Sequence, residues 1–242
     1  PLANPLRPLC LDDEPSDTAA LDEAIAEVRA MLASASRPAI LAGAEIGRFG
    51  LQDDLIRLVE QLNVPIASTL LGKSIIREDH PLYVGVYGGL IARDEVQQFI
   101  NASDCLLILG SILSDVEDLN ADSPLLTEGR TIHATADRVA IKHHRYDAIR
   151  FQDFVKALVS NTLPSFPSRP LLAPLSVVQG TIAPDAPVTL NGLFRHLDSL
   201  LNEHTLVIAD VGESLFAAAD LHVHGRFEFI SPAYYTSMGF AV

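Results

Sequence analysis

The segment ADVGESLF, residues 209–216, has the composition of a turn that can bind an anion. An apolar strand is predicted to end at Asp210, the chain turns at Gly212, and a helix is predicted to begin near Ser214. Such a turn presents free backbone N–H groups and the positive end of the helix dipole, and both attract a phosphate or a carboxylate. An ordinary strand-to-helix turn capped by Ser214 accounts for the same residues. The segment alone leaves both interpretations open.

A second glycine-containing segment, GAEIGRFG at residues 43–50, follows a predicted strand and invites comparison with a nucleotide-binding loop. Its glycines are separated by four and three positions. A pyrophosphate loop needs the Gly-x-Gly-x-x-Gly spacing, which lets the backbone approach the ligand closely. We therefore predict that these glycines serve the strand-to-helix turn, and that no dinucleotide binds here.

The segment IKHHRYD offers His143, His144 and Tyr146, with Asp137 nearby, as possible metal ligands. Adjacent histidines on an extended segment point to opposite faces, and no second cluster has the spacing of metal ligands. We predict a surface or interface cluster, and no metal ligand in this chain. The motifs of a nucleophile elbow, a zinc protease helix and a phosphate-binding P-loop do not occur in the sequence.

The predicted elements place these segments at the ends of strands. Helical periodicity alternates with short apolar runs that end at glycine or a polar residue. This alternation predicts an α/β fold, a Rossmann-like parallel sheet with helices on both faces, because each parallel crossover needs a helix that shields the sheet. The predicted helices are 18–32, 51–62, 94–102 and 152–163, and the predicted strands are 38–43, 65–69, 81–87, 104–110 and 130–135.

Proline-rich segments divide the chain, because proline interrupts regular structure. We predict a linker at 1–17, a middle Rossmann-like domain at 18–163, a proline-rich linker at 164–188 and part of a second α/β domain at 189–242. In that last part the predicted elements are helix 190–201, strand 205–210, helix 214–221 and strand 227–230. This set is too small to close a hydrophobic core, so we expect an incomplete domain.

The charge balance argues against polyanionic partners. Thirty-one acidic and seventeen basic residues give a net charge of −14, which repels nucleic acid and anionic lipid surfaces. The apolar runs are too short to span a bilayer, and the N-terminus lacks a signal-peptide pattern. The two cysteines form neither a disulfide framework nor a metal motif. We expect a cytoplasmic protein that binds neither nucleic acid nor membrane.

Five stretches resemble the thiamine diphosphate-dependent 2-keto acid decarboxylases, the group of pyruvate, indolepyruvate and phenylpyruvate decarboxylases. Three resemble the middle domain of that family, and LVIADVGESLF and AYYTSMGFAV resemble the opening of its diphosphate-binding domain. The segment LLGKSIIREDHPLYVGVYGG makes the resemblance specific to this family. The apolar strand segments alone would not distinguish this family from others. The three middle-domain stretches are RPAILAGAEIGRFGLQDDLIRLVEQLNVPIASTLLGKSIIREDHPLYVGVYGG, DCLLILGSILSD and TIHATADRVAIKHHRYDAI.

The resemblance implies a carbon–carbon lyase, part of a longer chain, that converts a 2-keto acid to an aldehyde and carbon dioxide with thiamine diphosphate and Mg²⁺. In that family the catalytic glutamate lies in a domain that would precede Pro1. The metal-binding Gly-Asp-Gly…Asn motif would follow Val242. We therefore expect no catalytic residue among these residues, no activity of the fragment alone, and no binding of either cofactor without the absent parts.

The resemblance also assigns cofactor-binding residues. Val211, Gly212 and Glu213 correspond to the turn beside the diphosphate and the substrate. Thr236 corresponds to the residue whose carbonyl accepts a hydrogen bond from the aminopyrimidine. Met238 corresponds to the bulky apolar residue that holds the cofactor in its bent conformation. Without the flanking match, Met238 would be interpreted as a gap-filling core methionine.

Substrate and assembly follow from the same resemblance. Val116 and Leu215 stand where pyruvate-specific relatives often carry larger aromatic residues, which favours a roomier pocket and indolepyruvate or phenylpyruvate as substrate. The intact enzyme is expected to be a homodimer or homotetramer. Two alternatives stay open: an acetolactate synthase-like carboligase with a flavin against the middle domain, and a non-catalytic structural or interaction module.

Overall fold

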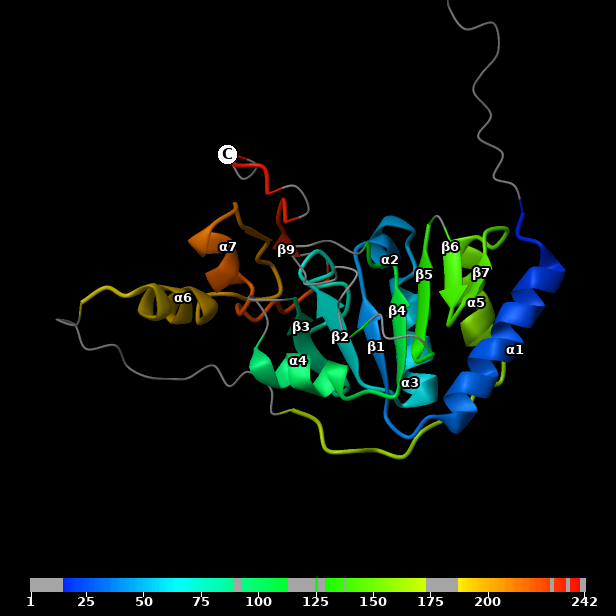
Figure 1. Ribbon diagram of the computed structural model, residues 1–242. Coiled ribbons are helices and arrows are strands. Elements are labelled where there is room, and N and C mark those ends of the chain that lie inside the picture. The colour runs from blue at the N-terminus through cyan, green and yellow to red at the C-terminus, as the bar shows by residue number, and fades with distance from the viewer. Residues whose placement is uncertain are drawn as a thin grey trace, which may run out of the picture.

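A seven-stranded sheet forms the centre of the larger part of the molecule (Figure 1). The computed structural model describes residues 15–88, 93–112, 125, 129–136, 138–172, 187–226, 229–233 and 236–239. The strand order is β3-β2-β1-β4-β5-β6-β7, and the strands from β3 to β5 are parallel. These strands are β1 (Pro38–Ala42), β2 (Ile66–Thr69), β3 (Tyr83–Tyr87), β4 (Cys105–Leu109) and β5 (Thr131–Thr135).

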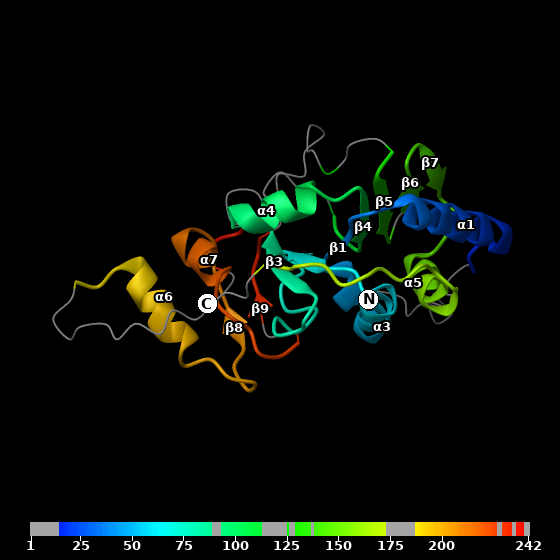
Figure 2. The same cartoon turned by 90° about the horizontal axis from the view of Figure 1, so that it is seen from below.

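Helices cover both faces of this sheet (Figure 2). α1 (Thr18–Ser34), α3 (Gln52–Leu62) and α5 (Phe151–Ser160) pack on one face, and α4 (Asp94–Asn101) packs on the other. Ile40 faces the three-helix side and its neighbour Leu41 faces α4, because successive strand residues point to opposite faces. The predicted α/β fold class is confirmed. Among the described residues, no helix combines the length and apolar character needed to cross a bilayer.

One edge of the sheet differs from the prediction. β6 (Arg138–Ile141) and β7 (His144–Tyr146) continue the sheet antiparallel beyond β5, so the sheet is mixed rather than wholly parallel. The β6–β7 hairpin turns at Lys142, whose φ is 52°. A lysine in the left-handed region of backbone conformation is uncommon. The segment IKHHRYD contains no glycine or proline that would have indicated a turn.

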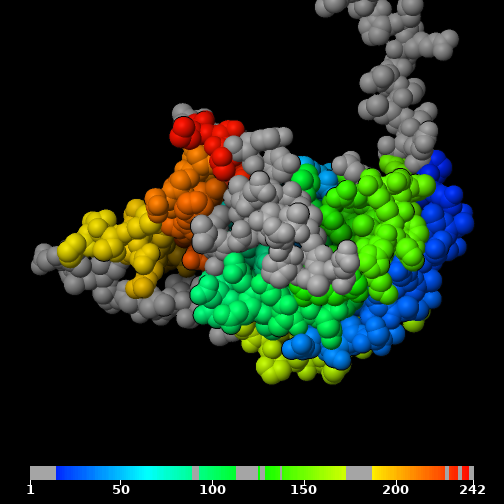
Figure 3. All heavy atoms as spheres, viewed as in Figure 1, coloured from blue at the N-terminus to red at the C-terminus, as the bar shows by residue number. Residues whose placement is uncertain are grey.

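The C-terminal part forms a smaller lobe beside the sheet (Figure 3, yellow to red). Its elements are α6 (Leu190–Asp198), β8 (Val207–Ile208), α7 (Glu213–Ala218) and β9 (Phe229–Ile230), with β8 and β9 paired in parallel. β8 is shorter than the predicted strand 205–210, whereas residues 227 and 228 of the predicted strand 227–230 lie outside the described residues. Leu215, Ala218 and Phe229 are buried in one cluster with Leu70, which follows β2. The lobe therefore packs directly against the larger part of the molecule.

Candidate functional site

The turn at residues 211–213, which the sequence left open as an anion-binding turn or an ordinary one, lies between β8 and α7. Val211 is partly buried, whereas Gly212 and Glu213 are exposed at the start of α7. Gly212 has a φ of 95°, and a Cβ added to it would meet nothing within 4 Å. Backbone conformation, rather than crowding, thus favours glycine here. The backbone of this turn is accessible to a ligand.

Thr236 and Met238 lie in the segment that follows β9. Both residues are exposed, and 87% of Met238 is accessible to solvent. Thr236 has a φ of 50°, and its N–H donates a hydrogen bond to the carbonyl of Pro232 at 2.9 Å. A β-branched residue in the left-handed region is strained, and such strain is concentrated at functional sites. The exposure of Met238 is unlike that of a core-filling methionine.

Asp210 joins these two segments. One carboxylate oxygen, Oδ1, accepts a hydrogen bond from Val211 N at 2.8 Å, and Oδ2 accepts one from Gly239 N at 2.7 Å. The 211–213 turn and the 236–239 segment, which are far apart in the sequence, are therefore held side by side. Asp210 was not predicted to have a role, although a polar residue at the end of an apolar strand, followed by Val-Gly, is the signal that pointed to the turn.

Of the two residues predicted to line the substrate pocket, the structure describes only Leu215. Leu215 is 2% exposed and packs in the cluster between the lobe and the loop after β2. Val116 lies outside the described residues. Their contact with a substrate stays a prediction.

The loops after β1 and β4 pack against one another. The strand order reverses between these strands, and open α/β sheets bind ligands at such a switch point. Here Gly43 N donates to Leu109 O and Glu45 N donates to Gly110 O, both at 2.9 Å. The buried Glu45 carboxylate accepts a hydrogen bond from Ala136 N at 2.9 Å. Backbone groups and a buried carboxylate of the protein thus satisfy one another between these loops.

This close approach makes Gly43 sensitive to substitution. A Cβ at residue 43 would lie 2.3 Å from both Gly110 O and Ser111 Cα, which are backbone atoms and cannot rotate away. We expect Gly43→Ala to lower the free energy of unfolding by about 3 kcal/mol, the upper end of the usual cost of overpacking. Urea unfolding followed by circular dichroism measures this change.

Gly50→Ala is the matched control for this prediction. Gly50 has a φ of +66°, but a Cβ there meets nothing within 4 Å. We expect a loss of about 1 kcal/mol, from the left-handed backbone alone. Equal losses in the two variants would contradict the steric role of Gly43.

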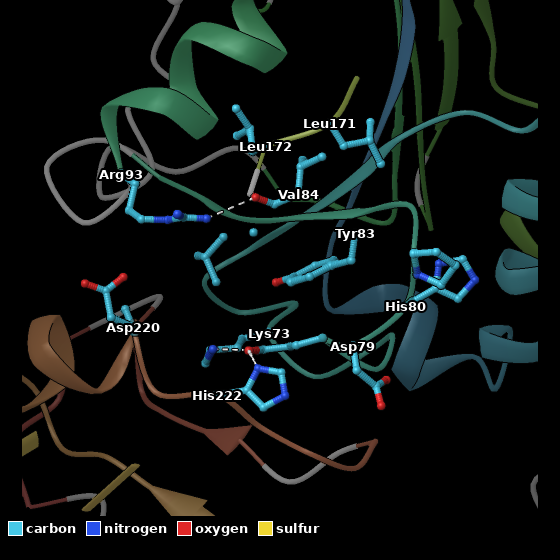
Figure 4. A pocket seen from close by; sticks show the side chains of 15 residues that line it. Lys73, Asp79, His80, Tyr83, Val84, Arg93, Leu171, Leu172, Asp220 and His222 are labelled. Atoms are coloured by element: carbon cyan, nitrogen blue, oxygen red, sulfur yellow. Dashed lines mark hydrogen bonds and ion pairs between the residues drawn. The ribbon is translucent and has the colours of Figure 1, made fainter. Parts of the chain in front are cut away.

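A cavity of about 460 Å³ lies between β3 and the residues that follow α7 (Figure 4). Arg93 and Asp220 lie on one side of it, and Lys73 and His222 lie close together on another. Burial raises the pKa of the Asp220 carboxyl, and the positive charges of Arg93 and Lys73 oppose that shift. Both parts of the chain therefore line this cavity. The described residues that were predicted to bind cofactor or substrate do not line it.

The histidine cluster connects β7 to α1. His144 Nδ1 lies 2.9 Å from Glu27 Oε2, and the Tyr146 hydroxyl donates to the same oxygen at 3.2 Å. Burial raises the pKa of Tyr146 to about 12, and Glu27 adds to the shift. Asp137 lies outside the described residues. Among the residues that the structure describes, no three His, Cys, Asp or Glu side chains are close enough together to hold a metal ion.

The chain matches the model of a protein family described as "Thiamine pyrophosphate enzyme, central domain" over residues 25–161. It is 29% identical to the indole-3-pyruvate decarboxylase of Azospirillum brasilense, over 94% of this chain and 42% of that protein. It is 26% identical to pyruvate decarboxylase isozyme 2 of Saccharomyces cerevisiae, over 86% of this chain and 37% of that protein. It is 26% identical to pyruvate decarboxylase 1 of Pisum sativum, over 97% of this chain and 40% of that protein. The chain thus spans about two fifths of the length of these relatives.

Proposed function

The chain belongs to the thiamine pyrophosphate enzymes, whose central domain is matched by residues 25–161, and from this we propose that it is part of a 2-keto acid decarboxylase that uses thiamine diphosphate and Mg²⁺. The domain boundaries proposed are those predicted above, with 189–242 as the start of the diphosphate-binding domain. Residues outside this chain would supply the catalytic glutamate and the metal ligands. The intact enzyme is proposed to be a cytoplasmic homodimer or homotetramer.

The observation that carries this proposal is the hydrogen bond from Gly239 N to Asp210 Oδ2. It brings together the two segments to which the family resemblance assigns cofactor contacts, although about twenty residues separate these segments in the chain. In both segments the assigned residues are exposed or partly buried, so they are accessible to a ligand. These residues suit a bound thiamine diphosphate.

Each assigned residue has a separate task in this proposal. The turn of Val211, Gly212 and Glu213 would face the diphosphate, where the backbone N–H groups of Gly212 and Glu213 would favour negative charge, because that of Val211 already donates to Asp210. The carbonyl of Thr236 would accept a hydrogen bond from the aminopyrimidine, and the Met238 side chain would support the bent cofactor by its shape. When bound, the cofactor supplies the electron sink that allows carbon dioxide to leave the 2-keto acid.

We propose indolepyruvate or phenylpyruvate as the substrate. Leu215 and Val116 are smaller than aromatic residues, and one relative is named an indole-3-pyruvate decarboxylase. The test compares kcat/KM of the full-length protein for indolepyruvate, phenylpyruvate and pyruvate with thiamine diphosphate and Mg²⁺. A preference for pyruvate would contradict the substrate proposal. No turnover of any of the three would contradict the decarboxylase proposal.

The two methionines of this chain allow a matched test of the cofactor site. We expect Met238→Ala to lower kcat of the full-length protein about a hundredfold, because a misplacement of reacting groups by about 1 Å costs that much. Stability should change by less than about 0.5 kcal/mol, because the side chain is 87% exposed. Steady-state kinetics and urea unfolding measure the two effects.

Met31→Ala is the control for this test, because Met31 is 5% exposed and packs in the main core. The effects should be reversed: stability falls by about 2–3 kcal/mol and kcat is retained. A Met238→Ala variant with unchanged kcat would refute the assignment of Met238.

The flavin-containing carboligase is disfavoured by the packing at the β1–β4 switch point. Gly43, Glu45 and Gly110 occupy the place where a dinucleotide would be expected to bind in an open α/β sheet. Flavin absorbance in the purified full-length protein would reverse this conclusion.

A further inference from the structure

A buried ion pair lies in the loop between β2 and β3. Lys73 Nζ is 2.5 Å from Glu78 Oε1, and the two side chains are 1% and 5% exposed. The attraction within such a pair offsets the cost of removing both charges from water only when further hydrogen bonds satisfy their remaining atoms. Here the additional bonds go to the other part of the chain. Lys73 Nζ donates to Leu221 O at 2.8 Å, and Glu78 Oε2 accepts from Val223 N at 3.3 Å.

The same loop makes further contacts with β9. Ser74 Oγ accepts a hydrogen bond from Phe229 N at 3.1 Å, and Lys73 Nζ lies 5.5 Å from the centroid of the Phe229 ring. His222 adds a ring nitrogen, Nδ1, 4.0 Å from Glu78 Oε2. The loop therefore holds the smaller lobe at three backbone positions: Leu221, Val223 and Phe229.

These three positions lie between the two proposed cofactor-binding segments. The 211–213 turn leads through α7 to Leu221, and Phe229 leads to the segment of Thr236 and Met238. Asp210, next to the 211–213 turn, accepts a hydrogen bond from Gly239 and so joins the two ends of the segment 210–239. A displacement of the lobe from the loop would therefore move both segments relative to the sheet.

We infer that Lys73 and Glu78 form a latch that positions the lobe for cofactor binding, a role that rests on the function proposed above. Neither residue belongs to the assigned cofactor contacts, so both are positioning residues rather than catalytic ones. The latch is specific in its geometry, because each charged group satisfies one backbone group of the lobe. An apolar pair of similar size would fill the space but leave Leu221 O and Val223 N without these partners.

The test uses the full-length protein with both charges removed, as Lys73→Met/Glu78→Leu. We expect hydrogen exchange at Val223 and Phe229 to become faster in the apo protein. The dissociation constant for thiamine diphosphate with Mg²⁺, measured by calorimetry, should rise about tenfold, as expected when the binding-competent arrangement is populated one tenth of the time. Arg145→Gln/Asp147→Asn, which removes an exposed pair 2.6 Å apart on the far edge of the sheet, is the matched control and should change neither quantity.

The outcomes separate the latch from the function on which it rests. Unchanged exchange at Val223 and Phe229 overturns the latch, whatever the cofactor data show. Faster exchange with a dissociation constant within about twofold of wild type overturns the positioning role. Absence of binding by the wild-type protein overturns the proposed function, and the exchange measurement then decides the latch alone. Ser74→Ala removes one bond of the same loop and should raise exchange at Phe229 even if the double variant fails to fold.

Discussion

Glu78→Leu is expected to lower the free energy of unfolding by about 3–5 kcal/mol, the usual cost of removing one partner of a buried ion pair. Lys73 is 1% exposed at its side chain, so its ammonium group would be left without a counter-charge and without water. Val223 N would lose its acceptor as well. Equilibrium urea unfolding, with the slope checked against wild type, measures the loss.

Adding Lys73→Met to this variant is expected to recover most of the lost stability. With both charges gone, no unpaired charge is buried, and the exchange of a buried ion pair for apolar side chains of similar volume is often neutral. The remaining loss comes from Leu221 O and Val223 N, which lack their partners in the double variant. The coupling between the two substitutions is obtained from the double-mutant cycle. If the double variant were as unstable as Glu78→Leu alone, an unpaired charge would not be the cause of the loss.

Sequence patterns predicted the larger part of the fold well, because its elements follow the two simple periodicities. The run PAILA is buried at every position in β1, and the apolar stripe of α3 buries Leu55, Leu58 and Leu62. The β6–β7 hairpin was missed, since its turn residue, Lys142, adopts a conformation that the sequence does not indicate. The strand 205–210 was predicted to be longer than β8 because its apolar run is typical of a buried strand, whereas Leu206 and Ile208 are about half exposed in the structure.

The candidate site could be predicted only in part from the sequence. Val211, Gly212, Glu213, Thr236 and Met238 were singled out by family resemblance, but nothing in their spacing showed that Asp210 joins the two segments. Lys73 and Glu78 belong to a segment recognised as specific, yet charged residues in a loop are usually solvated. Their burial depends on a lobe that begins more than a hundred residues later in the chain, and short-range patterns do not report such contacts.

Phe151→Ala is expected to destabilise the protein by about 3–5 kcal/mol, the cost of the lost burial and of the cavity left behind. Phe151 begins α5 and is 0% exposed. Its ring contacts that of Phe49 edge-on, with centroids 5.9 Å apart, and a Cβ at Gly110 would lie 3.1 Å from its Cζ. The ring therefore packs beside the closed β1–β4 switch point, where little rearrangement is available to fill a cavity.

Phe216→Ala provides the same chemical change on α7, where the ring is 48% exposed, and should cost less than about 1 kcal/mol. Phe151→Leu should fall between these two variants, because a smaller apolar side chain keeps part of the packing. Urea unfolding of the three variants measures this order. A loss at Phe151→Ala no larger than that at Phe216→Ala would show that the loops around the switch point can collapse into the space of the ring. In that case the switch point would be deformable, and its loops could move apart to admit a ligand.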